Sequence, residues 1–173
     1  MQRAELLSKT AGVASLLPSR RFALLLTGLL CLAGCQTFTI PTPADFVERE
    51  QPDWGSYRYR ALNADAVVLG VREVEEDPQR PVSLAFWAKA VKNKLQASHA
   101  YALLGEEELA VASGQKALLL RLGSETSGTQ YDYWVTLVDA GDELFVIEAG
   151  GQRESFAKVA DSLRGSIKGF EVK

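Results

Sequence analysis

Cysteine and histidine are nearly absent from this chain of 173 residues, which holds two cysteines and one histidine. With His99 as the only histidine, no pair of histidines can ligate a metal, and histidine catalysis would depend on this residue alone. Its neighbour Ser98 does not make a triad, because triad partners meet through the fold and need a third, orienting group. A surface or capping histidine is the simpler interpretation, and we predict neither catalytic nor metal-binding residues.

A hydrophobic run long enough to span a membrane is also missing. The main apolar stretch, residues 22–33, holds 12 residues, whereas a spanning helix needs roughly 20. Arg20 and Arg21 precede the stretch and small residues follow it, which is the pattern of a secretory signal peptide. We therefore predict a signal peptide over residues 1–34. An ordinary cleaved signal and a transmembrane anchor are the alternatives.

The four residues Leu32-Ala33-Gly34-Cys35 resemble the lipobox of bacterial lipoproteins. The resemblance implies cleavage between Gly34 and Cys35, a diacylglycerol thioether on Cys35, and acylation of the new amino end. Several acyl chains on one residue suffice for stable anchoring in a bilayer. Cys31 would leave with the leader, so no free thiol would remain. Apart from this covalent lipid, we predict no cofactor.

The position after the cysteine bears on location. Gln36 stands where an aspartate would retain a lipoprotein in the inner membrane of enteric bacteria. The resemblance to lipoproteins therefore implies a protein of the cell envelope, anchored in the bilayer on the periplasmic face of the outer membrane.

Clustered positive charge is lacking from the rest of the chain. Of the charged residues, 15 of 19 basic and 21 of 22 acidic ones follow Cys35, a net charge of −6. This balance argues against nucleic acid as a partner. Two acidic clusters, residues 73–77 and residues 106–108, lack the alternate ligand spacing around a glycine that a calcium loop requires. We interpret both as solvated faces, since charge runs usually lie in loops.

Composition divides the exported part in two. Residues 35–53 contain prolines and little periodicity, so we predict the lipidated cysteine and a flexible tether there. Residues 54–173 have the size and patterning of one globular domain. Strands are predicted at residues 57–60 and 66–74, joined by a turn at residues 63–65. A helix is predicted from one apolar stripe: Leu84, Trp87, Ala88, Val91 and Leu95.

The second half of the domain alternates strands and turns. Ser113-Gly114 and residues 139–142 predict tight turns, residues 123–129 a loop, and Gly150-Gly151 the end of the sheet. A closing helix is predicted from Phe156, Val159, Ala160, Leu163 and Ile167. Three consecutive leucines at residues 118–120 require both faces of a central strand to be buried. We therefore predict an α+β fold in which helices cover both faces of an antiparallel sheet, an α/β/α sandwich.

This element order, a strand pair, a helix, a three-strand antiparallel meander and a closing helix, resembles the PsbP-like fold over residues 54–173. The turns at residues 113–114 and 139–142 and the closing helix carry the resemblance. It implies a non-enzymatic assembly factor or accessory protein, since most members of that fold are of this kind.

The predicted partner-binding residues are Tyr57, Arg58, Tyr59 and Arg60, where two aromatic and two basic side chains alternate. Tyrosine and arginine are enriched at binding hot spots, and alternation would place the tyrosines on one face and the arginines on the other. A charged edge strand is the simpler interpretation. We predict a non-enzymatic accessory, assembly or binding module with an envelope protein as partner. The alternatives are an envelope hydrolase and a carrier of lipid or another small ligand, which would need an apolar cavity between helix and sheet.

Overall fold

A computed structural model describes residues 37–49, 56–77, 79, 82–98 and 100–173. The predicted signal peptide with Gly34, the predicted lipidation site Cys35, and His99 lie outside the described residues. Residues 36–173 form one compact unit. No helix within the described ranges is long and apolar enough to cross a membrane.

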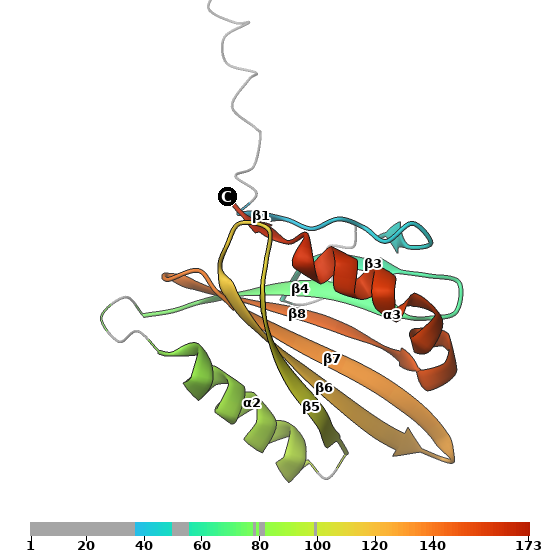
Figure 1. The fold of residues 1–173 in the computed structure, drawn as a ribbon. Coiled ribbons are helices and arrows are strands. Elements are labelled where there is room, and N and C mark those ends of the chain that lie inside the picture. The colour runs from blue at the N-terminus through green and yellow to red at the C-terminus, as the bar shows by residue number, and fades with distance from the viewer. Residues whose placement is uncertain (1–36, 50–55, 78, 80–81, 99) are drawn as a thin grey trace, which may run out of the picture. The chain divides into compact units, whose positions relative to one another are not determined.

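The unit is built on an antiparallel sheet of seven strands in the order β2-β3-β4-β8-β7-β6-β5 (Figure 1). Their bounds are β2 Val47–Glu48, β3 Tyr57–Leu62, β4 Val68–Glu75, β5 Ala102–Ala110, β6 Lys116–Thr126, β7 Thr129–Asp139 and β8 Glu143–Gln152. Two helices, α2 (Leu84–Ala97) and α3 (Arg153–Lys168), accompany the sheet. The predicted α+β class with an antiparallel sheet is confirmed. The meander has four strands, β5 to β8, rather than the three predicted.

Tight turns connect the long strands, and one of them corrects the predicted loop at residues 123–129. Strands β6 and β7 continue to Thr126 and from Thr129, so only Ser127 and Gly128 form the turn. Both have positive φ, 54° and 78°, which is the conformation of a two-residue turn matched to the twist of a hairpin. The hairpin is therefore longer than its polar composition predicted.

The glycine pair at 150–151 does not end the sheet, because both residues lie inside β8. A Cβ on Gly151 would lie 2.9 Å from Cγ2 of Val67, and one on Gly150 would lie 3.2 Å from Cδ2 of Tyr133. The glycines make room for neighbouring side chains, a known use of glycine within strands.

The predicted tether is wrong over residues 37–49, and the globular domain begins before residue 54. A short strand β1 (Phe38–Thr39) pairs with β9 (Glu171–Val172) near the C-terminus. Phe38 and Phe46 are buried in the hydrophobic core. The prolines of this segment obscured its periodicity, but two large apolar side chains outweigh that signal because their burial stabilises the fold.

Two hydrophobic clusters draw on alternate residues of the same strands. On β6, Leu119 belongs to the cluster that contains buried residues of α3, whereas Leu118 and Leu120 belong to the cluster that contains Ala88 of α2. Since alternate residues of a strand point to opposite faces, each helix packs with a different set of sheet side chains. Three consecutive leucines in β6 thus serve both clusters.

The two helices differ in how completely their apolar stripes are buried. In α3, Phe156, Leu163 and Ile167 are at most 1% exposed. In α2, which Ser83 caps by accepting a hydrogen bond from the Phe86 N–H, only Ala88 is buried. The other predicted stripe residues of α2, Leu84, Trp87, Val91 and Leu95, are only partly buried. On the sheet, Leu137 and Leu144 of the same cluster are buried, whereas Val74 and Val146 are only partly buried, so α2 leaves part of this face open.

Candidate functional site

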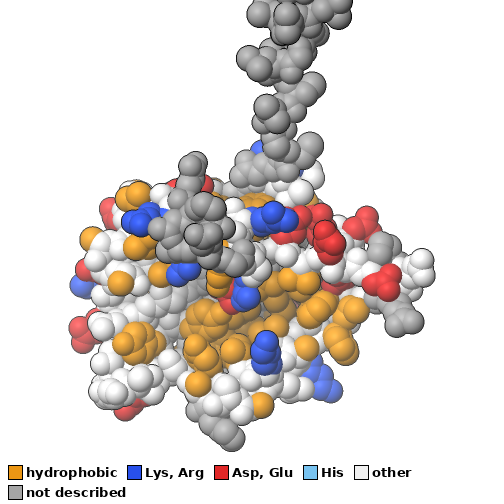
Figure 2. All heavy atoms as spheres, turned by 180° about the vertical axis from the view of Figure 1, so that it is seen from behind, with side chains coloured by type: hydrophobic (Ala, Val, Ile, Leu, Met, Phe, Trp, Pro, Cys, Tyr) orange, Lys and Arg blue, Asp and Glu red, His pale blue; other side chains and the backbone are white. Residues whose placement is uncertain are grey.

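A groove lies between α2 and the strands β4, β7 and β8 and encloses about 490 Å³. Its helix wall consists of Trp87, Ala90, Val91, Lys94 and Leu95. Its sheet wall is mainly apolar: Val74, Val135, Leu137, Leu144 and Val146. Figure 2 shows a continuous hydrophobic region on the face of the molecule turned away from Figure 1, with several basic side chains on and around it. Volume and lining are those of a typical small-ligand site.

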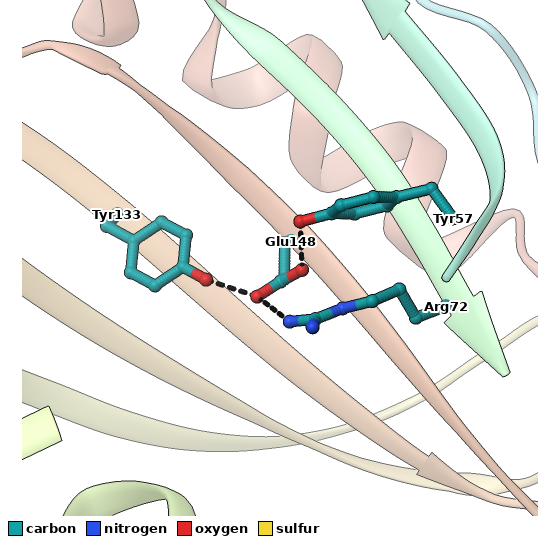
Figure 3. Close-up of polar contacts among 4 residues, drawn as sticks. All are labelled: Tyr57, Arg72, Tyr133 and Glu148. Carbon is teal, nitrogen blue, oxygen red and sulfur yellow. Dashed lines mark hydrogen bonds and ion pairs between the residues drawn. The ribbon is translucent and has the colours of Figure 1, made fainter. Parts of the chain in front are cut away.

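A cluster of four polar side chains lies at the apolar sheet wall (Figure 3), and three of them, Arg72, Tyr133 and Glu148, line the groove. The carboxylate of Glu148 accepts a hydrogen bond of 2.5 Å from the hydroxyl of Tyr57 on one oxygen. Its other oxygen accepts from the Tyr133 hydroxyl and from the guanidinium of Arg72. Glu148 is only 7% exposed, so these three donors replace water around a buried charge.

The strands that supply this cluster are neighbours in the sheet. Glu148 of β8 pairs with Gly70 of β4 on one side and with Val135 of β7 on the other. A Cβ on Gly70 would lie 2.7 Å from Cε1 of Tyr57. The missing side chain at Gly70 therefore lets the Tyr57 ring cross β4 and reach the carboxylate.

Burial and Glu148 together set the electrostatics of the cluster. Burial, the hydrogen bond to Glu148 and the charge of Glu148 raise the pKa of Tyr57 to about 12. The same causes in the same order raise the pKa of Tyr133. Burial would lower the pKa of Arg72, but the charge and hydrogen bond of Glu148 outweigh it and raise that pKa. Both tyrosines thus keep their protons and remain donors to the carboxylate over the physiological pH range.

The predicted partner-binding strand contributes one residue to this cluster. A register shift in the pairing of β3 with β4 sets Tyr57 opposite Arg72 and Tyr59 opposite Val71. Tyr59 is consequently buried in the cluster that contains α3 residues and contacts Thr42 through its hydroxyl. The prediction that both tyrosines share one face is wrong, because the bulge adds a residue between them.

The two arginines of that strand also serve contacts within the domain. Arg58 is exposed and lies 3.4 Å from Glu73, and the guanidinium of Arg60 lies 5.4 Å from the centre of the Tyr57 ring. The expected exposed tyrosine pair is absent from the described surface. Of the four predicted residues, Arg58 and the half-buried Tyr57 and Arg60 remain accessible.

Sequence patterns missed Arg72, Tyr133 and Glu148, because they belong to three strands and follow no motif. One signal was present: Glu148 is a lone carboxylate within the apolar run of residues 144–149. A charged residue inside a buried strand requires partners, and this requirement marks the position as unusual.

The two acidic clusters are mainly strand residues rather than loops. Glu73 and Glu75 lie in β4, and residues 106–108 lie in β5. Glu106 pairs with Lys92 of α2, and Glu107 pairs with Arg164 of α3, each at 2.7 Å. Within the described part of the chain, no group of three or more metal-ligating side chains could hold a metal ion.

Comparison with solved structures places this fold among known ones. The chain is similar to cyanobacterial PsbP (CyanoP) from Synechocystis, with 12% identity and a TM-score of 0.60 over 79% of this chain and 87% of that one. The chain is also similar to LpqN of Mycobacterium tuberculosis, which is described as involved in cell envelope biogenesis. The identity is 12% and the TM-score 0.60, over 79% of this chain and 83% of LpqN. The Ran-binding protein Mog1p of Saccharomyces cerevisiae is 15% identical, with a TM-score of 0.54 over 79% of this chain and 90% of that one.

These similarities support the predicted PsbP-like fold. No protein-family model and no curated protein sequence matches the chain. At such low identity the comparison concerns the fold alone, and the function has to be argued from the groove.

Proposed function

We propose that this chain is a lipid-anchored, non-catalytic binding module of the bacterial cell envelope, and that the groove beneath α2 is its binding site. The observation that carries the proposal is the unequal burial of the two helices. Helix α3 buries three of its five stripe residues completely, whereas α2 buries only Ala88 and leaves Trp87, Val91 and Leu95 partly in contact with solvent. Apolar surface left open costs about 25 cal/mol per Å², so a ligand that covers it is favoured, and a mainly apolar groove with a few polar groups is the usual form of a small-ligand site.

The anchor and the envelope location rest on the lipobox resemblance at Leu32-Ala33-Gly34-Cys35. A neighbour of the same fold, LpqN, is described as a protein of cell envelope biogenesis, which agrees with that location. None of the three names of similar structures describes an enzyme. An anchored module holds its ligand or partner at a membrane surface, which suits an accessory or assembly role.

The polar cluster does not favour the hydrolase alternative. Glu148 is the buried carboxylate of the groove, and both of its oxygens already accept hydrogen bonds from the protein. A general base needs an oxygen within hydrogen-bond reach of the substrate proton. The carrier alternative agrees better with the structure, because it requires an apolar cavity between helix and sheet.

Filling the groove tests the proposal. Ala90 lines the groove, whereas Ala85 lies on the exposed side of α2. We expect residues 36–173 to bind the neutral apolar dye N-phenylnaphthylamine saturably, with Ala90→Phe weakening binding at least tenfold and Ala85→Phe leaving it unchanged. Thermal melts followed by circular dichroism check the folding of both variants. The absence of saturable binding, or equal effects of the two substitutions, would refute the groove as the site.

A further inference from the structure

The charges along the groove indicate which kind of apolar ligand it takes, an inference that rests on the proposed function. Four charged residues line the groove: Arg72, Glu73, Lys94 and Glu148. Arg72 forms an ion pair with Glu148, and Glu73 forms one with Arg58. Lys94 has no ion pair within the described residues, so one positive charge on the helix wall is uncompensated.

Lys94 is also distinct from the other lysines of its helix. Lys92 is engaged with Glu106 at 2.7 Å, and neither Lys89 nor Lys92 lines the groove. Lys94 lies in the last turn of α2, and its side chain combines a four-carbon apolar stem with a charged end. Such a side chain can cover apolar surface while its ammonium group stays in water at the rim.

The sheet wall offers a second basic group opposite the helix. Arg72 has five N–H donors, and the bond to Glu148 Oε1 engages its Nη2. The Nε of Arg72 is buried and has no hydrogen-bond partner within the described part of the chain. The guanidinium lies 5.1 Å from the centre of the Tyr57 ring, which fixes its orientation. Because Nε is buried, a ligand meets the exposed part of the guanidinium, in a side chain that is 36% exposed. This guanidinium on the sheet wall and the Lys94 ammonium on the helix wall thus flank the apolar lining.

We propose that the groove binds a single-chain amphiphile with an anionic headgroup. The acyl chain lies against the partly exposed apolar side chains of the groove, Val74, Val91 and Val146, and the headgroup meets Lys94 and Arg72. A volume of about 490 Å³ falls within the range of roughly 300–1,000 Å³ typical of small-ligand sites. Charge complementarity favours an anion over a neutral or cationic headgroup.

Three dodecyl amphiphiles of equal chain length test the headgroup preference. The binding of dodecyl phosphate, dodecyl maltoside and dodecyltrimethylammonium to residues 36–173 would be measured by calorimetry below their micelle-forming concentrations. This fragment contains every member of both hydrophobic clusters and forms one compact unit. We expect dodecyl phosphate to bind roughly fivefold more tightly than the maltoside, as for one solvent-accessible ion pair, and the cation to bind most weakly.

Charge reversal on α2 provides the matched controls. Lys94→Glu should abolish or reverse the preference for phosphate, whereas Lys89→Glu, on the same helix but outside the groove, should preserve it. Raising the salt concentration should reduce the preference in the wild type, because salt screens exposed charges. Equal affinity for all three amphiphiles, or equal effects of the two charge reversals, would overturn the inference and leave the proposed groove intact.

An apolar helix of a partner protein is the competing occupant of the groove. A fourth ligand, a helical peptide, distinguishes this occupant from an amphiphile. If a leucine- and alanine-rich helical peptide binds and Ala90→Phe blocks it while no amphiphile binds, the inference fails and the proposed binding site stands. If neither peptide nor amphiphile binds, both fail.

Discussion

Phe38 stacks on Phe170 with ring centroids 5.4 Å apart and planes inclined by 26°. Phe170 lies just after α3, so this contact joins the start of the described chain to its end. The backbone continues the connection, because the N–H of Lys173 donates to the carbonyl of Thr37 at 2.8 Å. The segment predicted to be a tether is thus held by both side-chain and backbone contacts.

Removing the Phe38 ring should destabilise the domain strongly. We expect Phe38→Ala to lower the free energy of unfolding by about 3–5 kcal/mol, the usual cost of deleting a buried phenylalanine. Urea unfolding of residues 36–173 measures the change. Phe86→Ala is the control, because Phe86 is 59% exposed and its loss should change stability by less than about 0.5 kcal/mol. Equal stability of the two variants would restore the tether interpretation.

The unequal packing of the helices predicts unequal sensitivity to truncation. Phe156→Ala and Leu163→Ala in α3 should each cost about 2–5 kcal/mol, because both side chains are fully buried. Leu95→Ala in α2 should cost less than half as much, because Leu95 faces the open groove. Melting temperatures that fall equally for Leu163→Ala and Leu95→Ala would mean that α2 is packed as tightly as α3.

The tyrosines around Glu148 predict a loss of stability in alkali. Because the pKa of Tyr57 is about 12 in the fold and about 10 in the unfolded chain, the folded state binds more protons between these values. Stability is therefore full below pH 10 and decreases as pH rises toward 12. Tyr57→Phe should make this decrease shallower in urea titrations from pH 9 to 11.5, and the remainder comes from Tyr59 and Tyr133, whose pKa values burial also raises. Tyr131→Phe, outside the cluster, should retain the wild-type slope.

Substitution by alanine should have opposite effects on stability at Gly151 and at Gly165, because their surroundings differ. Gly151→Ala should destabilise the domain by about 1–3 kcal/mol, because its Cβ would lie 2.9 Å from Cγ2 and 3.2 Å from Cα of Val67. Gly165→Ala in α3 meets no atom within 4 Å and should stabilise by about 0.5–1 kcal/mol, since alanine favours helices. Chemical denaturation compares the two, and changes of the same sign would contradict the account of the β8 glycines.

The lipid anchor is tested at Cys35. We expect Cys35→Ser to abolish palmitate labelling of the full chain and to leave an unprocessed or mislocalised precursor. The core beginning at Phe38 should still fold, since its residues lie beyond the substitution. Limited proteolysis of the precursor, with recovery of a resistant fragment near residue 37, checks this. Labelling that persists in the variant would remove the basis of the lipoprotein assignment.

Local patterns predicted the elements well and the contacts between them poorly. The turn near Ser113-Gly114 and the apolar stripe of residues 156–167 are local signals, and the structure contains a turn and the closing helix there. The turn was predicted to have two residues, but the hydrogen bonds of Val111 to Gly114 and Gln115 make it a loop of three, residues 112–114. The bulge in β3 has no local signature, because it depends on how Tyr57 and Tyr59 meet β4. A shift of one residue moves a side chain to the other face, which is why alternation placed Tyr59 wrongly.

The groove itself could not be predicted from the helix stripe. Trp87, Val91 and Leu95 follow the same spacing whether a helix packs tightly or stands away from a sheet. That difference depends on the sheet residues that face α2, among them Tyr133 and Glu148. Both lie far from α2 in the sequence. Glu148 was visible as a lone charge in an apolar strand, but its partners come from three other strands.

Strand β5 forms one end of the seven-stranded sheet and pairs only with β6 within the described residues. An edge of nine residues is long enough to recruit a strand from another molecule. Residues 106–108 place three consecutive glutamates there, so both faces of the edge carry negative charge. Lys92 and Arg164 pair with Glu106 and Glu107, so Glu108 is the one of the three without an ion pair among the described residues. A second copy pairing through β5 would have to place its own strand beside this charge, which disfavours fibril-like growth. If the proposed lipid anchor gathers copies on a membrane, this charged edge would help to keep neighbouring copies separate.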